Sequence, residues 1–366
     1  MKRLLCLLAI VWMTFALRAA FINGQNYVSI PDWARASGYR IILNSRDQIV
    51  LSNRTSRLIF NTDSAESEIN GVNVRLSYPV AKGPLISQLD IDTTIRPLIS
   101  APRLSPRKIT TICIDAGHGG KDTGNRVPGF FWHNEKNYTL ALAFELRDQL
   151  KKAGFNVILT RDSDVFVELP LRPLKANRLG ADLFVSLHFN AAQNSRSAVQ
   201  GPETYCITPV GAASSNAQGE GADHGPTMAN RVEDKSLRFA YEVQKALVQN
   251  LHTEDRDVRR ARFAVLRDAQ MPAILIEGGY MTHPVEGKKI FDPVYRQQMA
   301  DAIVKGIESY QRLTSPVPIA APPTSPVGPS TSVPTTVRVI NPPPTPAASP
   351  TAPPRDDRRY PSPRGR

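Results

Sequence analysis

Apolar and polar residues alternate in two different ways along this chain. Between residues 108 and 313, short apolar runs are followed by segments with an apolar residue at every third or fourth position. The first pattern predicts buried strands, and the second predicts amphipathic helices. A strand within 108–117 and a helix over 135–154, with a basic last turn and a glycine at its end, are the clearest examples.

Further strands are predicted within 155–161, 181–192 and 272–280. Further helices are predicted within 169–180, 235–251 and 292–313. This alternation predicts an α/β fold class: a largely parallel, twisted sheet with helices on both faces, over residues 108–314. A Gly-, Ala- and Ser-rich insertion over 211–234 is a poor helix former, so we expect a mobile loop near the functional site.

Residues 21–107 are expected to form a separate small β-rich domain, because short alternating runs are joined there by polar turns. One short helix is predicted in "IPDWARASGY". The region resembles the small N-terminal repeat domain that is named after copper amine oxidases, through "INGQNYVSIPDWARASGY" and "INGVNVRLSYPV". That resemblance implies a spacer or wall-contact module and implies no bound copper.

The two ends of the chain have distinct compositions. Residues 1–20 carry two basic residues, an apolar stretch and two closing alanines, which is typical of a secretory signal peptide. The stretch is shorter than the ~20 residues of a membrane span, although an uncleaved anchor is the alternative. Residues 315–366 are rich in Pro, Ser and Thr without apolar periodicity, which predicts a disordered basic tail.

These features predict an exported protein of the periplasm or cell envelope, with no membrane span once the signal is removed. The net charge of +12 favours an anionic partner such as a wall polymer, and no nucleic-acid-binding motif is present. No coiled-coil pattern appears, so we expect a monomer. Cys113 and Cys206 could form a disulfide in an oxidising compartment, but both lie in apolar runs that favour buried free thiols.

The stretch "CIDAGHGGKDTGN" raises the question of a phosphate-binding loop. Such a loop requires a glycine five positions before the Gly-Lys pair and a Ser or Thr after it. Asp115 and Asp122 occupy these two positions. A carboxylate would repel a phosphate, so the phosphate-loop hypothesis fails.

A metal site fits the same stretch better. His118 follows one predicted strand, His188 closes another, Glu277 ends a third, and Glu135 begins a helix. Open α/β sheets place their sites at this edge, and an ionised buried Glu needs a partner. Two His and one Glu are a known ligand set of catalytic zinc, and a further carboxylate can then act as acid and base.

Five segments resemble the catalytic domain of zinc-dependent N-acetylmuramoyl-L-alanine amidases. They are "IDAGHGGKDTG", "EKNYTLALAFELRDQLKKAGFNVILTR", "LRPLKANRLGADLFVSLHFNAA", "ETY" and "PAILIEGGYMTH". The resemblance implies that peptidoglycan is the substrate and that the amide between N-acetylmuramic acid and L-alanine is cut. It further implies that His118, Glu135 and His188 bind zinc and that Glu277 is the catalytic residue.

Asn190 and Arg172 are candidates for orienting these groups or contacting substrate, and a plain structural role is the alternative for both. The ligand set alone leaves two other functions open. One is a secreted zinc peptidase that cuts within the stem peptide. The other is a non-catalytic wall-binding protein, which loss of Glu277 alone would have indicated. The sequence names no activating partner.

Overall fold

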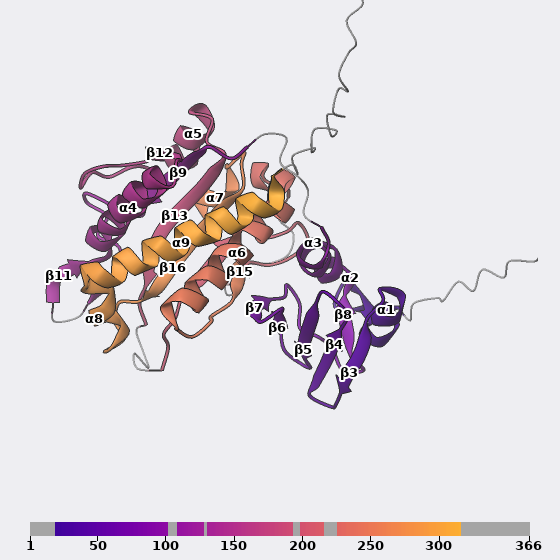
Figure 1. Cartoon of the computed structure of the whole chain (residues 1–366). Coiled ribbons are helices and arrows are strands. Elements are labelled where there is room, and N and C mark those ends of the chain that lie inside the picture. The colour runs from indigo at the N-terminus through magenta and orange to yellow at the C-terminus, as the bar shows by residue number, and fades with distance from the viewer. Residues whose placement is uncertain (1–18, 102–107, 128–129, 193–197, 216–224, 316–366) are drawn as a thin grey trace, which may run out of the picture. The chain divides into compact units, whose positions relative to one another are not determined.

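The computed structural model describes residues 19–101, 108–127, 130–192, 198–215 and 225–315 (Figure 1). The predicted signal peptide, apart from Ala19 and Ala20, and the predicted tail beyond Ser315 lie outside these residues. Across the described part of the chain, no helix is long and apolar enough to cross a membrane.

The site is carried by the parallel part of an eleven-stranded sheet, whose order is β12-β9-β13-β16-β14-β15-β7-β6-β5-β4-β3. Neighbours among β12, β9, β13 and β16 are parallel, whereas β14 runs antiparallel to β16 and parallel to β15. The expected largely parallel sheet is therefore confirmed, except that β14 and β15 run in the opposite direction to β16. These strands are β9 (Thr111–Ala116), β12 (Asn156–Leu159), β13 (Leu183–Asn190), β14 (Glu203–Cys206), β15 (Val258–Arg260) and β16 (Ala273–Tyr280).

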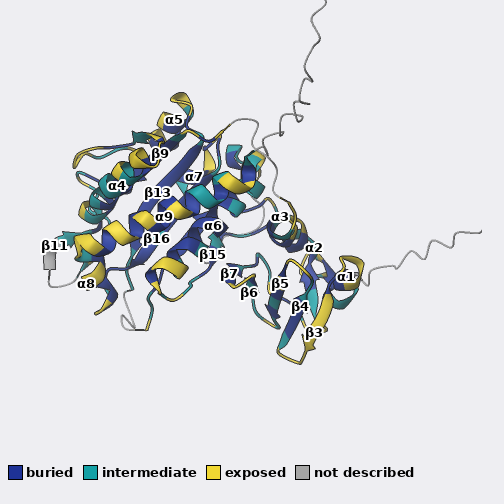
Figure 2. Cartoon of the chain, viewed as in Figure 1, coloured by how far each residue is buried: buried dark blue, intermediate teal, exposed yellow. Residues whose placement is uncertain are grey.

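Helices cover both faces of this part of the sheet, as predicted. Figure 2 shows β9, β13 and β16 in the dark blue of buried residues, with exposed positions on the outer surface of α9. Ile112 and Val185 face one apolar cluster, and their neighbours Cys113 and Phe184 face the other. Both faces are buried because each strand alternates its side chains between two helical layers. The helices are α4 (Glu135–Lys152), α5 (Leu171–Arg178), α6 (Glu233–Leu251), α7 (Ala264–Arg267), α8 (Glu286–Phe291) and α9 (Pro293–Thr314).

The N-terminal strands continue the same sheet. Strands β3 to β7 pair antiparallel in chain order, and β7 pairs in parallel with β15 through Val74 and Val258. One apolar cluster also runs through both regions. The boundary near residue 107 stays a prediction, but the regions on either side of it share strand pairing and core. These strands are β3 (Arg40–Asn44), β4 (Gln48–Ser52), β5 (Arg57–Asn61), β6 (Glu66–Ile69) and β7 (Val72–Arg75).

The rest of the N-terminal region forms a three-stranded sheet and several short helices. The predicted helix is α1, which Ser29 caps by accepting a hydrogen bond from the Asp32 amide. The alternation of residues did not predict β1, β8 or the helical segments that follow β8. These elements are β1 (Ala19–Ile22), β2 (Gln25–Ser29), α1 (Ile30–Ala36), β8 (Leu85–Ser87), α2 (Gln88–Asp90), a π-helical turn (Ile91–Ile95) and α3 (Arg96–Ile99).

Two local predictions have clear outcomes. Cys113 and Cys206 are both free and buried, so the structure contains buried thiols instead of the alternative disulfide. The insertion over 211–234 was expected to contain no helix, and this is wrong at its C-terminal end. A 3₁₀ helix spans Met228–Val232, because the Asn230 side chain accepts a hydrogen bond from the Thr227 amide and fixes its first turn. Residues 216–224, where the mobile loop was expected, lie outside the described residues.

Candidate metal centre and acid–base site

The four residues expected in the site come from four elements at the carboxyl edge of the parallel strands. His118 follows β9, Glu135 begins α4, and His188 lies near the end of β13. Their donor atoms all lie within 4.8 Å of one another, the one such group among the described residues. Glu277 of β16 is in register with His188, so it stands beside this group on the neighbouring strand.

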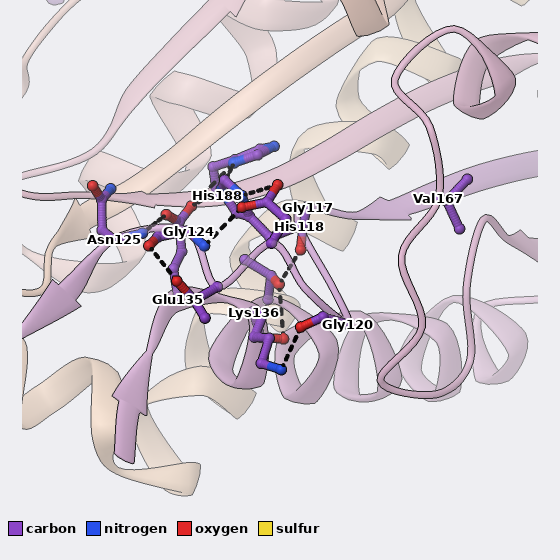
Figure 3. Close-up of polar contacts among 12 residues, drawn as sticks. Gly117, His118, Gly120, Gly124, Asn125, Glu135, Lys136, Val167 and His188 are labelled. Carbon is purple, nitrogen blue, oxygen red and sulfur yellow. Dashed lines mark hydrogen bonds and ion pairs between the residues drawn. The ribbon is translucent and has the colours of Figure 1, made fainter. Parts of the chain in front are cut away.

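A tight turn brings His118 into place (Figure 3). His118 itself has a φ of 61°, a left-handed conformation that is rare outside glycine. There is no room for a side chain at Gly117, because a Cβ there would lie 2.4 Å from His188 Cε1. Lys136 of α4 donates to the Gly120 carbonyl at 2.8 Å and so ties the turn to the helix. The glycine cluster therefore serves close approach around His118.

Glu135 contacts both histidines (Figure 3). Its Oε1 is 3.0 Å from both His118 Nε2 and His188 Nδ1, and these two nitrogens are 3.1 Å apart. Phe189 and Asn125 also donate their backbone amides to this carboxylate. Burial alone would raise the pKa of Glu135, but the two histidines outweigh it and hold that pKa well below its usual range. Glu135 is thus a carboxylate, as a metal ligand must be.

Asp122 fixes the other nitrogen of His118. Its Oδ2 lies 2.9 Å from His118 Nδ1, and its Oδ1 accepts the Gly124 amide at 3.0 Å. Burial would lower the pKa of His118, yet the contacts to Glu135 and Asp122 raise it. A carboxylate in this position selects the tautomer that offers Nε2 to a metal.

Arg172 lies beneath the turn. It is 1% exposed, pairs with Asp115 at 2.8 Å and donates to the His118 carbonyl at 2.9 Å. Asp115 is fully buried and also accepts from Thr160 at 2.6 Å and from Ser186 at 2.7 Å. The structure therefore places Arg172 where it supports His118, and its burial leaves no surface for substrate.

Glu277 differs from Glu135 in having no partner. Its Oε2 is buried and makes no hydrogen bond to any described residue. Burial, followed by the charges of Glu135 and Glu203, raises the pKa of Glu277 well above its usual range. A raised pKa of this kind suits a carboxyl group that accepts a proton and later releases it, as a general acid–base group must.

Glu203 of β14 is in register with Glu277 on the opposite side from His188. Its carboxylate accepts hydrogen bonds from Tyr205 at 2.8 Å, Tyr280 at 2.9 Å and Asn190 at 3.2 Å. Asn190 is therefore joined to the site through Glu203.

Sequence reasoning gave no role to Asp115, Asp122 or Glu203. A charged residue inside an apolar strand run, as in "TICIDAG", was the available signal for Asp115. Asp122 lies four residues after His118 in the quoted glycine-rich stretch, and Glu203 opens the quoted "ETY". Their partners become visible only in three dimensions.

Comparison with known proteins shows the family of this chain. A family model described as N-acetylmuramoyl-L-alanine amidase matches residues 112–309, and the chain belongs to this family. An uncharacterized protein of Bacillus subtilis, YqiI, is 38% identical over 57% of this chain and 89% of its own length.

The relatives that carry the amidase name include the following two. The amidase AmiC of Neisseria meningitidis is 33% identical over 54% of this chain, and the match spans 52% of AmiC. The solved structure of AmiC2 of Nostoc punctiforme is 34% identical, with a TM-score of 0.46, over 56% of this chain and 97% of that one.

Proposed function

We propose that this protein is a zinc-dependent N-acetylmuramoyl-L-alanine amidase that acts on peptidoglycan in the cell envelope. It would hydrolyse the amide between the lactyl group of N-acetylmuramic acid and the L-alanine of the stem peptide, in wall remodelling or cell separation. The observation that carries this proposal is a group of three metal donors within 4.8 Å, next to a buried carboxylate oxygen without a hydrogen bond.

The donor set fits zinc. Two imidazole nitrogens and one carboxylate oxygen leave a fourth position for water, and no cysteine takes part. We propose His118, Glu135 and His188 as the ligands. When bound, zinc supplies a Lewis acid that polarises the substrate carbonyl and lowers the pKa of water to ~7.

The chain's own residues would move the proton. Glu277 accepts a proton from water at its carboxylate while the water oxygen bonds to the carbonyl carbon of the amide. The C–N bond then breaks, and Glu277 delivers the proton to the departing nitrogen of L-alanine. Asp122 keeps His118 in one tautomer during this step. We expect Asn190 to act through Glu203, and Arg172 to hold the turn that carries His118.

Both reactions need the same donor set, so the donors alone do not separate the amidase from the peptidase. The family match favours the amidase. Residues 1–20 support export to the envelope, because their pattern is that of a signal peptide.

Digestion of peptidoglycan separates the candidates. The purified mature chain is incubated with wall sacculi, with and without a chelator, and the fragments are weighed by mass spectrometry. Free stem peptides beginning at L-alanine, absent when the chelator is present, are expected. Cuts only between stem-peptide residues would assign the peptidase instead, and intact sacculi would leave a wall-binding protein.

A further inference from the structure

The starting observation is a row of three functional groups across neighbouring strands. His188 of β13, Glu277 of β16 and Glu203 of β14 are directly paired in register. Residues paired in this way present their side chains on the same face of a sheet, within contact of one another. Glu277, in the middle, has an unbonded Oε2, whereas the carboxylate of Glu203 is surrounded by donors.

Two arginines next to this row are directed to Glu203. Arg256 Nε donates to Glu203 Oε1 at 3.0 Å, and Arg259 lies 3.6 Å from the same oxygen. A buried, unpaired carboxylate is a strong competitor for a nearby guanidinium. Both arginines are thus paired with acidic groups other than Glu277: Arg256 with Glu203, and Arg259 with Glu203 and, at 3.5 Å, with Asp257. An arginine paired with Glu277 would occupy the carboxylate oxygen that is free of hydrogen bonds to the described residues.

The segment 254–259 that carries the arginines is held in a costly conformation. Asp257 has a φ of 82°, which is strained for a residue with a side chain, and it is 8% exposed. Such a conformation persists only where the surroundings impose it. The Asp257 carbonyl accepts the Thr204 amide at 3.3 Å, which joins the segment to the strand of Glu203.

The N-terminal region supplies much of this constraint. The Asn73 amide donates to Asp255 Oδ2 at 2.8 Å, and the Asn73 side chain donates to the Asp255 carbonyl at 3.0 Å. Beside these bonds, Val74 of β7 pairs with Val258 of β15. On the catalytic side, Gln244 of α6 donates to Asp255 Oδ1 at 2.8 Å.

We propose that the N-terminal region is a positioning element of the site: through Asn73 and Asp255 it fixes the segment 254–259, so that Arg256 and Arg259 stay on Glu203 and off Glu277. This inference rests on the proposed amidase function for its kinetic test. It gives the N-terminal region a role in the reaction, in addition to any contact with the wall.

The test compares Asn73→Ala and Asp255→Ala with Tyr241→Phe. Tyr241 donates to the Ile69 carbonyl at 2.8 Å, so Tyr241→Phe also removes a bond between the two regions, but one that involves no residue of the segment 254–259. We expect Asp255→Ala to lower kcat about tenfold with KM and zinc content unchanged, as for groups that orient a metal site from outside. Asn73→Ala should act in the same direction and less strongly, and Tyr241→Phe should leave kcat unchanged.

A second substitution separates misplacement of the arginines from a general loss of folding. Arg256→Gln added to Asp255→Ala should restore part of the lost kcat, because one of the released arginines is then gone. No restoration, or an equal loss of kcat in Tyr241→Phe, would overturn the proposal.

Hydrogen exchange tests the positioning role of the N-terminal region independently of the amidase function. If the wild-type chain cuts no peptidoglycan, the amidase function falls, and exchange still reports on the coupling. Asn73→Ala should speed exchange over 202–206 and 254–260, whereas Tyr241→Phe should not. Unchanged exchange in Asn73→Ala would contradict the inference, whatever the activity.

Discussion

The parallel half and the antiparallel half of the eleven-stranded sheet differ in where the carboxyl ends of their strands lie. Strands β12, β9, β13 and β16 run parallel, so residues that follow or end them gather at one edge. His118, His188 and Glu277 meet there although they are far apart in sequence. Strands β3 to β7 run antiparallel, so their carboxyl ends alternate between the two edges. No group of metal donors occurs among their described residues.

Both halves contain acidic residues, so the presence of acidic residues alone does not explain the site. The parallel direction of the strands brings the site residues together at one edge. The antiparallel half contributes differently: it completes the sheet beside β15 and contacts the segment next to Glu203. The following predictions test this division of labour, from the largest expected effect to the smallest.

Loss of a metal donor should have the largest effect. His188→Ala removes one of three donors, and we expect loss of bound zinc and a fall in kcat of about a thousandfold, because a metal supplies several kcal/mol to the transition state. Metal content and release of stem peptides measure this. His252→Asn, at an exposed left-handed position at the end of α6, is the matched control and should keep both. Full zinc content in the His188→Ala variant would show that His188 is not a zinc ligand.

Asp122 should matter for metal affinity more than for folding. Asp122→Asn weakens the contact to His118 Nδ1, and we expect zinc affinity to fall about ten- to a hundredfold. Competition with a fluorescent zinc chelator measures the affinity. The exposed Asp162, which follows β12, is the control, and Asp162→Asn should bind zinc like the wild type. Equal zinc affinities in Asp122→Asn and Asp162→Asn would show that Asp122 does not orient His118.

The pH dependence of kcat should follow the carboxyl group without a partner. Glu277 must be ionised to accept a proton, and its pKa is raised above its usual range. Activity is therefore expected to fall as the pH drops through this raised value, well above the ~4.3 of an ordinary Glu. A rate profile with a midpoint near that ordinary value would show that a different group limits the rate.

The smallest effect concerns stability at the segment 254–259. Burial, in the first place, raises the pKa of Asp257 to about 6. The folded state therefore binds its proton more tightly than the unfolded state, and stability falls as the pH rises through about 6. Asp257→Asn should raise the free energy of unfolding by about 1–3 kcal/mol at pH 8 and change it little at pH 4. Denaturant unfolding at the two pH values measures this, and an equal gain at both would contradict the assignment.

The sequence was sufficient for much of the parallel half. The four residues that it proposes for the site lie at strand ends or helix starts, and the structure brings them together at one edge of the sheet. It was insufficient where the partner comes from a distant element. Asp122 could be assigned only once His118 was seen in its turn, and Glu203 only once β14 was placed beside β16. The pairing of β7 with β15 joins strands about 180 residues apart, and short strands of this kind carry no local signal for register.

The variant Glu277→Gln tests the central claim most directly, because it removes the proton acceptor and keeps the shape of the side chain. Zinc per chain and release of stem peptides from peptidoglycan are measured on the same preparation. We predict a full complement of zinc together with a loss of activity of at least about a hundredfold, the contribution typical of a general acid–base group. A Glu277→Gln chain that binds zinc and cleaves peptidoglycan at the wild-type rate would contradict the account.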